Sequence, residues 1–71
     1  MTDYHALKAK MYECGYIQKT LAKELKITPT AFFNKAHDKS FFTTKEVGVM
    51  IKKLHLTSVD VMRIFFSKKV N

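Results

Sequence analysis

The sequence is poor in the residues that mark several large classes of protein. Its 71 residues include one cysteine, one proline and two glycines. A single cysteine cannot form an intramolecular disulfide, so the chain does not resemble the small secreted domains that disulfides stabilise. Because glycine and proline are rare, little of the sequence is suited to turns and loops. These absences favour an intracellular chain that consists mostly of regular secondary structure.

Long apolar runs are absent as well. No stretch approaches the roughly 20 residues of a transmembrane helix, and the first ten residues lack the apolar segment of a signal peptide. We therefore expect a cytoplasmic protein without a membrane partner. A chain of this length has a thin core and no room for a separate ligand-binding domain. The expectation is one domain over residues 1–71, without a small-molecule substrate.

The residues that could carry catalysis or bind a metal are few and scattered. His5, His37 and His55 are far apart, and Cys14 has no second cysteine beside it. The six carboxylates form no evident pair, and a glycine-rich phosphate loop is missing. We expect no enzyme activity, no metal and no cofactor. Cys14 is interpreted as a small residue of the core.

Positive charge, by contrast, is abundant. Thirteen lysine and arginine residues face six aspartate and glutamate residues, which gives a net charge of +7. Folding does not need this excess. It favours a polyanionic partner, either a nucleic acid or an anionic membrane surface. The lysines are spread over several segments, which disfavours a single amphipathic helix on a membrane.

Apolar residues recur at helical spacing along five segments, which predicts an all-α protein, a compact five-helix bundle. The expected helices cover about residues 3–14, 18–25, 29–37, 44–54 and 58–66. Gly15 would end the first helix. Thr43 with Glu46, and Thr57 with Asp60, have the spacing of capping boxes at the starts of the last two helices. Residues 67–71 are expected to form a basic tail.

The segment from Gln18 to His37 carries most of the functional information. Leu21 and Leu25 share one face of its first helix, and Thr28 followed by Pro29 is typical of a new helix start. A helix that stops near Leu25 and another that begins at Pro29 require a sharp change of direction. This pattern predicts a helix-turn-helix, whose second helix can enter the major groove of DNA.

The outward face of the second helix contains candidates for reading bases. Thr30 and Asn34 are four residues apart, so both should point into the groove; asparagine can pair with adenine, and threonine can contact a base or a thymine methyl group. Phe33 has two interpretations of equal weight: contact with thymine methyl groups, or packing on the loop at Phe41 or Phe42. The expected base-reading residues are Pro29, Thr30, Phe33 and Asn34.

Phosphate contacts are expected from residues that flank this helix. Gln18 would bring its amide and free backbone N–H groups to a phosphate. For any single lysine, simple solvation is the better interpretation. Several basic and polar residues nevertheless lie together just past the second helix. The expected phosphate-contacting residues are Gln18, Lys19, Lys35, His37, Lys39 and Ser40.

The segment QKTLAKELKITPTAFFNKAHDKSFFT is similar to the helix-turn-helix of phage Cro and repressor proteins and their bacterial relatives, the XRE family. The matching residues are Gln18, Leu21, Ala22, Ile27, Thr28, Asn34, Lys35 and Lys39. The resemblance implies a lambda repressor-like domain of five helices over nearly the whole chain. It also implies that the glutamine and the loop after the second helix hold phosphates, while outward positions of that helix read bases.

Two residues depart from the family pattern. Lys26 stands where the turn usually has glycine, so we expect it to adopt a left-handed backbone at some cost in strain. Asp38 replaces another frequent glycine, and it brings a negative charge close to the expected DNA.

The last helix carries more apolar residues than a small core can cover. They form two stripes: Val59, Met62 and Phe66, and then Val61, Ile64 and Phe65. One interpretation is that most of them cover the core. We favour the other, in which the stripe of Val61, Ile64 and Phe65 is the interface of a homodimer.

The leading hypothesis is a sequence-specific regulator of transcription that binds a double-stranded DNA operator. It would be a Cro-like repressor of phage or prophage type without a ligand domain. The rival hypothesis keeps the fold for a protein-interaction module such as an antirepressor, which would bind its protein partner through Phe33, Phe41 and Phe42.

Overall fold

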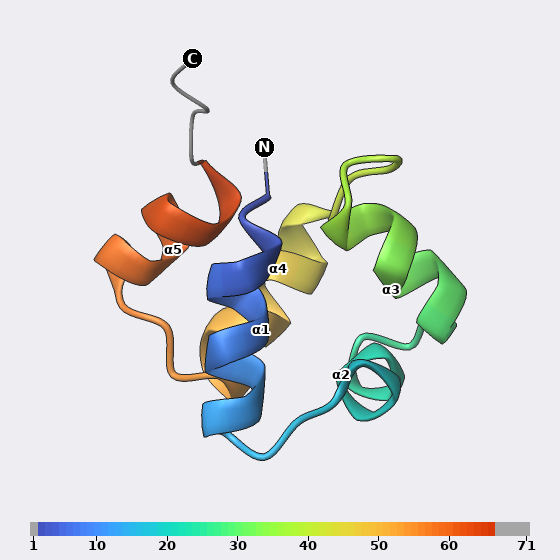
Figure 1. Cartoon of the computed structure of the whole chain (residues 1–71), viewed down its shortest axis with the longest axis horizontal. Helices are drawn as coiled ribbons and strands as arrows, with labels where there is room; N and C mark the ends of the chain where they lie inside the picture. Colours follow the sequence, from blue (N-terminus) through green and yellow to red (C-terminus); the bar gives the residue numbers. More distant parts are fainter. Residues whose placement is uncertain (1, 67–71) are drawn as a thin grey trace.

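The chain folds into helices joined by short turns in the computed structural model, which describes residues 2–66. The helices are α1 (Tyr4–Glu13), α2 (Gln18–Glu24), α3 (Pro29–Ala36), α4 (Thr44–Lys53) and α5 (Ser58–Phe65). In Figure 1, α1 occupies the middle, α5 lies on one side, and α2 and α3 lie on the other. The all-α architecture with its expected helix order is thus confirmed. The expected basic tail, residues 67–71, falls outside the described residues.

Four of the helices begin at a side chain that accepts a hydrogen bond from a backbone N–H three residues later. The capping residues are Asp3, Thr28, Thr43 and Thr57. In α4 and α5 the Glu46 and Asp60 side chains also accept the N–H of the capping threonine, which confirms both predicted capping boxes. Each such cap contributes about 1 kcal/mol. The starts of these helices are therefore encoded locally.

The ends of α1 to α4 share one geometry. The second residue past each helix has a left-handed backbone, with φ of 81° at Gly15, 60° at Lys26, 62° at Asp38 and 53° at His55. The N–H of the following residue then returns to a carbonyl oxygen of the last turn, as in the bond from Ile27 to Ala22. The expectation for Lys26 is confirmed, whereas nothing in the sequence singled out His55.

The core draws on every helix. Its largest fully buried side chains are Phe32, Leu7, Met11, Leu21, Met50, Leu54 and Ile64. Phe42, in the loop before α4, extends this core by packing edge-on against Phe32 and Phe65, with ring centroids 5.6 Å and 6.0 Å apart. The α3–α4 loop is thus attached to α5 through aromatic contacts.

The predicted arrangement of the two stripes on α5 is wrong. Ile64 is 1% exposed and Phe65 is 9% exposed, while Val61 packs partly buried against the core. The residues in water are instead Val59, Met62 and Phe66, with 72%, 61% and 61% of their surfaces exposed. The reason is tertiary: α5 packs against α1, and the N–H of Asp3 donates to the carbonyl oxygen of Ile64 at 2.7 Å. A dimer interface through Val61, Ile64 and Phe65 would require surface that the core already covers.

Candidate nucleic-acid interface

The α2–α3 pair forms one end of the molecule. The chain turns at residues 25–28, where Leu25 is buried, Ile27 packs against the core, and the Thr28 hydroxyl accepts the N–H of Ala31 at 3.0 Å. Figure 1 shows α2 almost end-on while α3 runs across the view. The two helices therefore cross steeply, and α2 supports one side of α3.

The opposite side of α3 is open. Phe32 and Ala36 are buried, whereas Pro29, Thr30 and Phe33 are exposed. Asn34, the fourth residue expected to read bases, is half-buried. Three of the four candidates are thus exposed on one short helix, and the fourth is half-buried.

Gln18 connects the two helices at their N-terminal ends. Its side-chain amide donates to the carbonyl oxygen of Pro29 at 3.3 Å. The residues are eleven apart in sequence, so local pattern could not predict this contact. It fixes the start of α2 beside the start of α3, where the free N–H groups of a helix favour an anion.

Phe33 does not stack on Phe41 or Phe42 of the loop, which was one of its two predicted arrangements; the other, contact with thymine methyl groups, stays a prediction. The Phe33 ring stacks on the ring of His37, with centroids 4.0 Å apart and planes 25° apart. The ring of Tyr4 in α1 also contacts the His37 ring, at a centroid distance of 4.4 Å and with the planes tilted by 40°. We call Phe33, His37 and Tyr4 the aromatic stack. It joins the open side of α3 to α1, and sequence reasoning missed it because Tyr4 and His37 are 33 residues apart.

A hydrogen bond to the backbone of α3 restricts how His37 can contact a phosphate. Its Nδ1 lies 2.9 Å from the carbonyl oxygen of Phe33. Because a carbonyl only accepts hydrogen bonds, Nδ1 must carry the hydrogen in this contact. The second ring nitrogen then becomes a donor only when the imidazole is protonated. His37 can therefore serve the predicted phosphate contact in its charged form alone.

Lys35 does not fit the predicted phosphate contact. Its ammonium group lies 2.7 Å and 2.8 Å from the two carboxylate oxygens of Glu46, and both side chains are mostly buried. Burial raises the pKa of Glu46, but the hydrogen bonds from Lys35 and from the backbone of Thr43 outweigh it, so the pKa is lowered. The lysine thus joins the last turn of α3 to the first turn of α4. It is neutralised by a neighbour instead of facing solvent.

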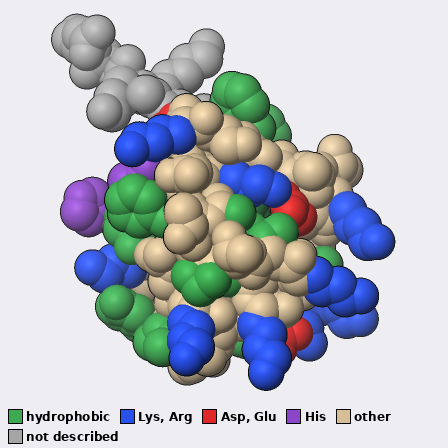
Figure 2. Space-filling view, turned by 90° about the vertical axis from the view of Figure 1, so that its right-hand side faces the viewer, with side chains coloured by type: hydrophobic (Ala, Val, Ile, Leu, Met, Phe, Trp, Pro, Cys, Tyr) green, Lys and Arg blue, Asp and Glu red, His purple; other side chains and the backbone are tan. Residues whose placement is uncertain are grey.

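The other predicted phosphate-contacting residues remain accessible. Lys19, Lys39 and Ser40 are exposed. Figure 2, which views the end of the molecule with α2 and α3, shows basic side chains at several places along its left, lower and right edges and acidic side chains at few places. Asp38, which precedes Lys39 in the sequence, accepts the N–H of Thr2 with its carboxylate at 3.0 Å.

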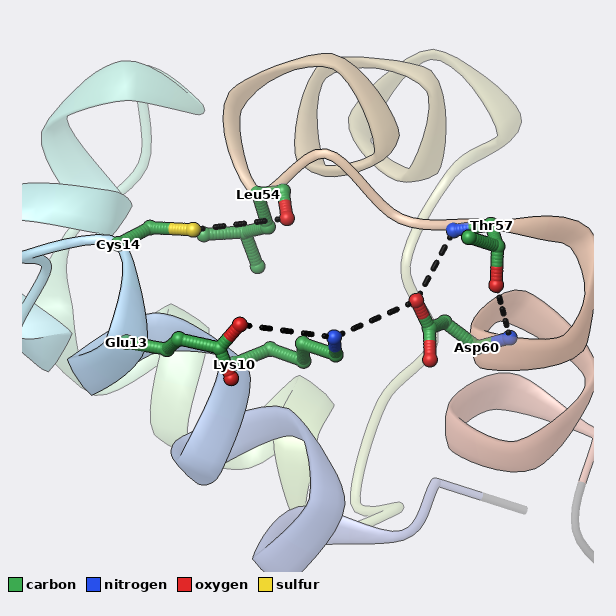
Figure 3. Close-up of polar contacts among 6 residues, drawn as sticks. All are labelled: Lys10, Glu13, Cys14, Leu54, Thr57 and Asp60. Atoms are coloured by element: carbon green, nitrogen blue, oxygen red, sulfur yellow. Dashed lines mark hydrogen bonds and ion pairs between the residues drawn. The ribbon is translucent and has the colours of Figure 1, made fainter.

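A further set of polar contacts holds α1 to the C-terminal half of the domain (Figure 3). Lys10 lies between Glu13 and Asp60, at 3.8 Å and 3.5 Å. The pKa of Asp60 is lowered, chiefly by the hydrogen bond from the Thr57 backbone, then by the Thr57 side chain and by Lys10. The Cys14 thiol donates to the carbonyl oxygen of Leu54 at 3.5 Å. The contacts of Lys10 and Cys14 therefore join α1 to α5 and to the end of α4.

Within residues 2–66 the structure shows no group of three or more His, Cys, Asp or Glu side chains placed to hold a metal ion. The same residues contain no helix that is both long and apolar enough to cross a membrane. No family model, curated protein or solved structure matches this chain.

Proposed function

We propose that the chain is a sequence-specific regulator of transcription that binds double-stranded DNA through α2 and α3. In this proposal the two helices act as a helix-turn-helix of the Cro-like repressor kind. The helix α3 lies in the major groove, and the N-terminus of α2 meets the phosphate backbone. The domain would regulate by occluding a promoter or competing for an operator.

The observation that carries the proposal is the open side of α3. This helix is packed on one side only, and its free side presents Thr30, Phe33 and part of Asn34 beside exposed lysines. A largely polar face on a short helix can stay in water, and the major groove is wide enough to admit an α-helix. The net charge of +7 gives an electrostatic attraction to the phosphates of a DNA duplex of any sequence.

The test is a selection of binding sites from random duplexes, followed by Asn34→Ala on the selected site. Loss of an asparagine that contacts an adenine should cost about 1–3 kcal/mol on that site and relax the preference at one base pair per half-site. Binding to random duplex should barely change. Failure to enrich any sequence would contradict the proposal, and equal losses on both duplexes would remove Asn34 from the base-reading set.

We also propose a homodimer, now through the exposed face of α5. Val59, Met62 and Phe66 form an apolar strip on this helix, and such a strip on a small protein usually marks a contact. A two-fold axis through it would pair the same strip on both copies. A single module makes a small interface with DNA, so a pair of α3 helices about 34 Å apart would raise affinity on an inverted repeat.

One observation favours the alternative of a protein-interaction module. Phe41 is 80% exposed, and with Phe66 it lines a hollow of about 210 Å³. An antirepressor would use this region on a protein partner. The two functions differ in their dependence on salt: binding to DNA weakens steeply as counterions are added, whereas apolar contact with a protein does not.

A further inference from the structure

The exposed ring of Phe33 on α3 indicates which chemical group of the DNA the domain contacts. We propose that Phe33 recognises the methyl group of a thymine in the major groove, and that Tyr4 and His37 hold its ring in position for this contact. The proposal rests on the proposed DNA-binding function and deepens it. It names one chemical group on the DNA, one residue that contacts it and two residues that position the contact.

The first step is the surroundings of Phe33. The ring is 40% exposed on the open side of α3, so it is neither a core residue nor a freely solvated one. In the aromatic stack, one face of the ring is occupied by the His37 imidazole. The rest of the ring is apolar surface next to Thr30, which lies one turn earlier on the same helix. A ligand for this position must offer an apolar group.

The second step is the rigidity of the stack. His37 is four residues after Phe33, and its Nδ1–H bonds back to the Phe33 carbonyl oxygen, so the imidazole is held by the same helix whose phenyl ring it supports. Tyr4 adds support from α1. Among the described residues Phe33 and Tyr4 make no ring contact with each other, and each of them contacts the imidazole of His37. A ring held this way loses little side-chain entropy on binding.

The third step is the chemistry of the groove. The base edges in the major groove present hydrogen-bond donors and acceptors, and thymine adds a C5-methyl group. A phenyl ring cannot satisfy donors, acceptors or phosphates, and stacking on a base would require that the duplex be opened. The methyl group is therefore the feature of an intact duplex that suits Phe33.

The experiment removes this methyl group without changing base pairing. On the duplex selected above, each thymine is replaced in turn by deoxyuridine, and the dissociation constants are compared. We expect a loss of about fourfold at one thymine per half-site, the effect of removing one buried methyl group from a contact. Phe33→Ala should bind the thymine and deoxyuridine duplexes equally, while it keeps the preference at the base pair that Asn34 reads.

The positioning role is tested on α1. Tyr4→Leu removes the ring that supports His37, and we expect the fourfold ratio to fall below about twofold. Tyr4→Phe restores a ring without the hydroxyl and should restore the ratio. Circular dichroism and thermal unfolding check that each variant is folded. If Tyr4→Leu is unfolded, His37→Leu makes the same test from within α3.

The possible failures are separable. If no duplex is enriched, both the proposed function and this inference are wrong. If a duplex is enriched but no deoxyuridine weakens binding, or if Phe33→Ala retains the fourfold ratio, the inference alone is overturned. A ratio that survives in both Tyr4→Leu and His37→Leu would leave Phe33 as the reader but overturn the positioning role of the stack.

Discussion

The helices α3 and α5 are similar on their inner sides and different on their outer sides. Each has eight residues and begins at a threonine cap. Each also carries two adjacent phenylalanines, the first buried and the second exposed: Phe32 and Phe33 in α3, and Phe65 and Phe66 at the end of α5. Two helices can therefore share length, cap and mode of anchoring to one core.

Their outer sides differ in chemistry. On α3 the exposed phenylalanine is surrounded by a hydroxyl, an amide and an imidazole, and one face of its ring is covered by that imidazole. On α5 the exposed phenylalanine continues an apolar strip with Met62 and Val59. The surface of α3 is mixed with polar groups and can remain in water. The surface of α5 is apolar, so covering it with another apolar surface removes apolar area from water and is favourable. The comparison teaches that the anchoring of a helix leaves its outer side free to take a separate function.

The largest expected effect separates the inner side of α5 from its outer side. Ile64→Ala should lower the free energy of unfolding by about 2–5 kcal/mol, because it leaves a cavity in the core. Met62→Ala, on the exposed strip, should change it by no more than about 0.5 kcal/mol. Urea unfolding followed by circular dichroism measures both. Equal losses would contradict the burial assigned to the two sides of α5.

The next effect concerns Lys35 of α3, which pairs with Glu46 instead of facing solvent. Lys35→Met should destabilise the domain by about 1–3 kcal/mol, since Glu46 then keeps a mostly buried carboxylate without its partner. Lys53→Met is the matched control, because it breaks the more exposed pair with Glu24, and we expect about 0.5 kcal/mol or less. If the two variants are equally stable, the Lys35–Glu46 pair does not matter to the fold.

The same pair predicts a dependence on pH. The pKa of Glu46 is lowered in the folded state, so its contribution to stability is complete above the pKa of the unfolded chain and is lost as the pH falls through the folded pKa. Glu46→Gln cannot lose this contribution. Stability should therefore fall less in Glu46→Gln than in the wild type between about pH 6 and about pH 3. Parallel pH profiles would contradict the lowered pKa.

A smaller effect tests the outer side of α5. Met62→Glu places a charge in the apolar strip, so we expect the loss of self-association and at least about tenfold weaker binding to an inverted repeat. Binding to an isolated half-site and helical content should be retained. Lys52→Ala, on the exposed side of α4, changes the net charge by the same amount and is the control. A wild-type protein that sediments as a monomer on and off DNA would rule out the dimer.

The smallest effect tests Lys39, which is exposed just past the end of α3. Lys39→Ala should weaken binding to all duplexes by a similar factor, and it should reduce the slope of log affinity against log salt by about 0.9 for the lost phosphate contact. Lys52→Ala is again the control, and it should leave the slope unchanged. A slope that falls equally in both variants would mean that only the total charge matters. A slope of zero in the wild type would favour the protein-interaction module.

The α2–α3 region shows how far sequence reasoning reaches. Thr28 and Pro29 predicted the start of α3 from adjacent residues, whereas the left-handed conformation of Lys26 was expected from the family resemblance, which has glycine at this position. The partners of Lys35 and Gln18 were not predicted, because each lies eleven residues away on another helix. The aromatic stack was missed for the same reason.

The sequence by itself determined the helices, their caps and the excess of positive charge, because helical periodicity, capping and charge are properties of short segments. It also predicted which residues of α3 face outward, of which Pro29, Thr30 and Phe33 are exposed. Only the tertiary structure decided which stripe of α5 is buried, since both stripes have helical spacing and similar hydrophobicity. The choice came from contacts with α1 and Phe42, which bury Ile64 and Phe65 and leave Met62 in water.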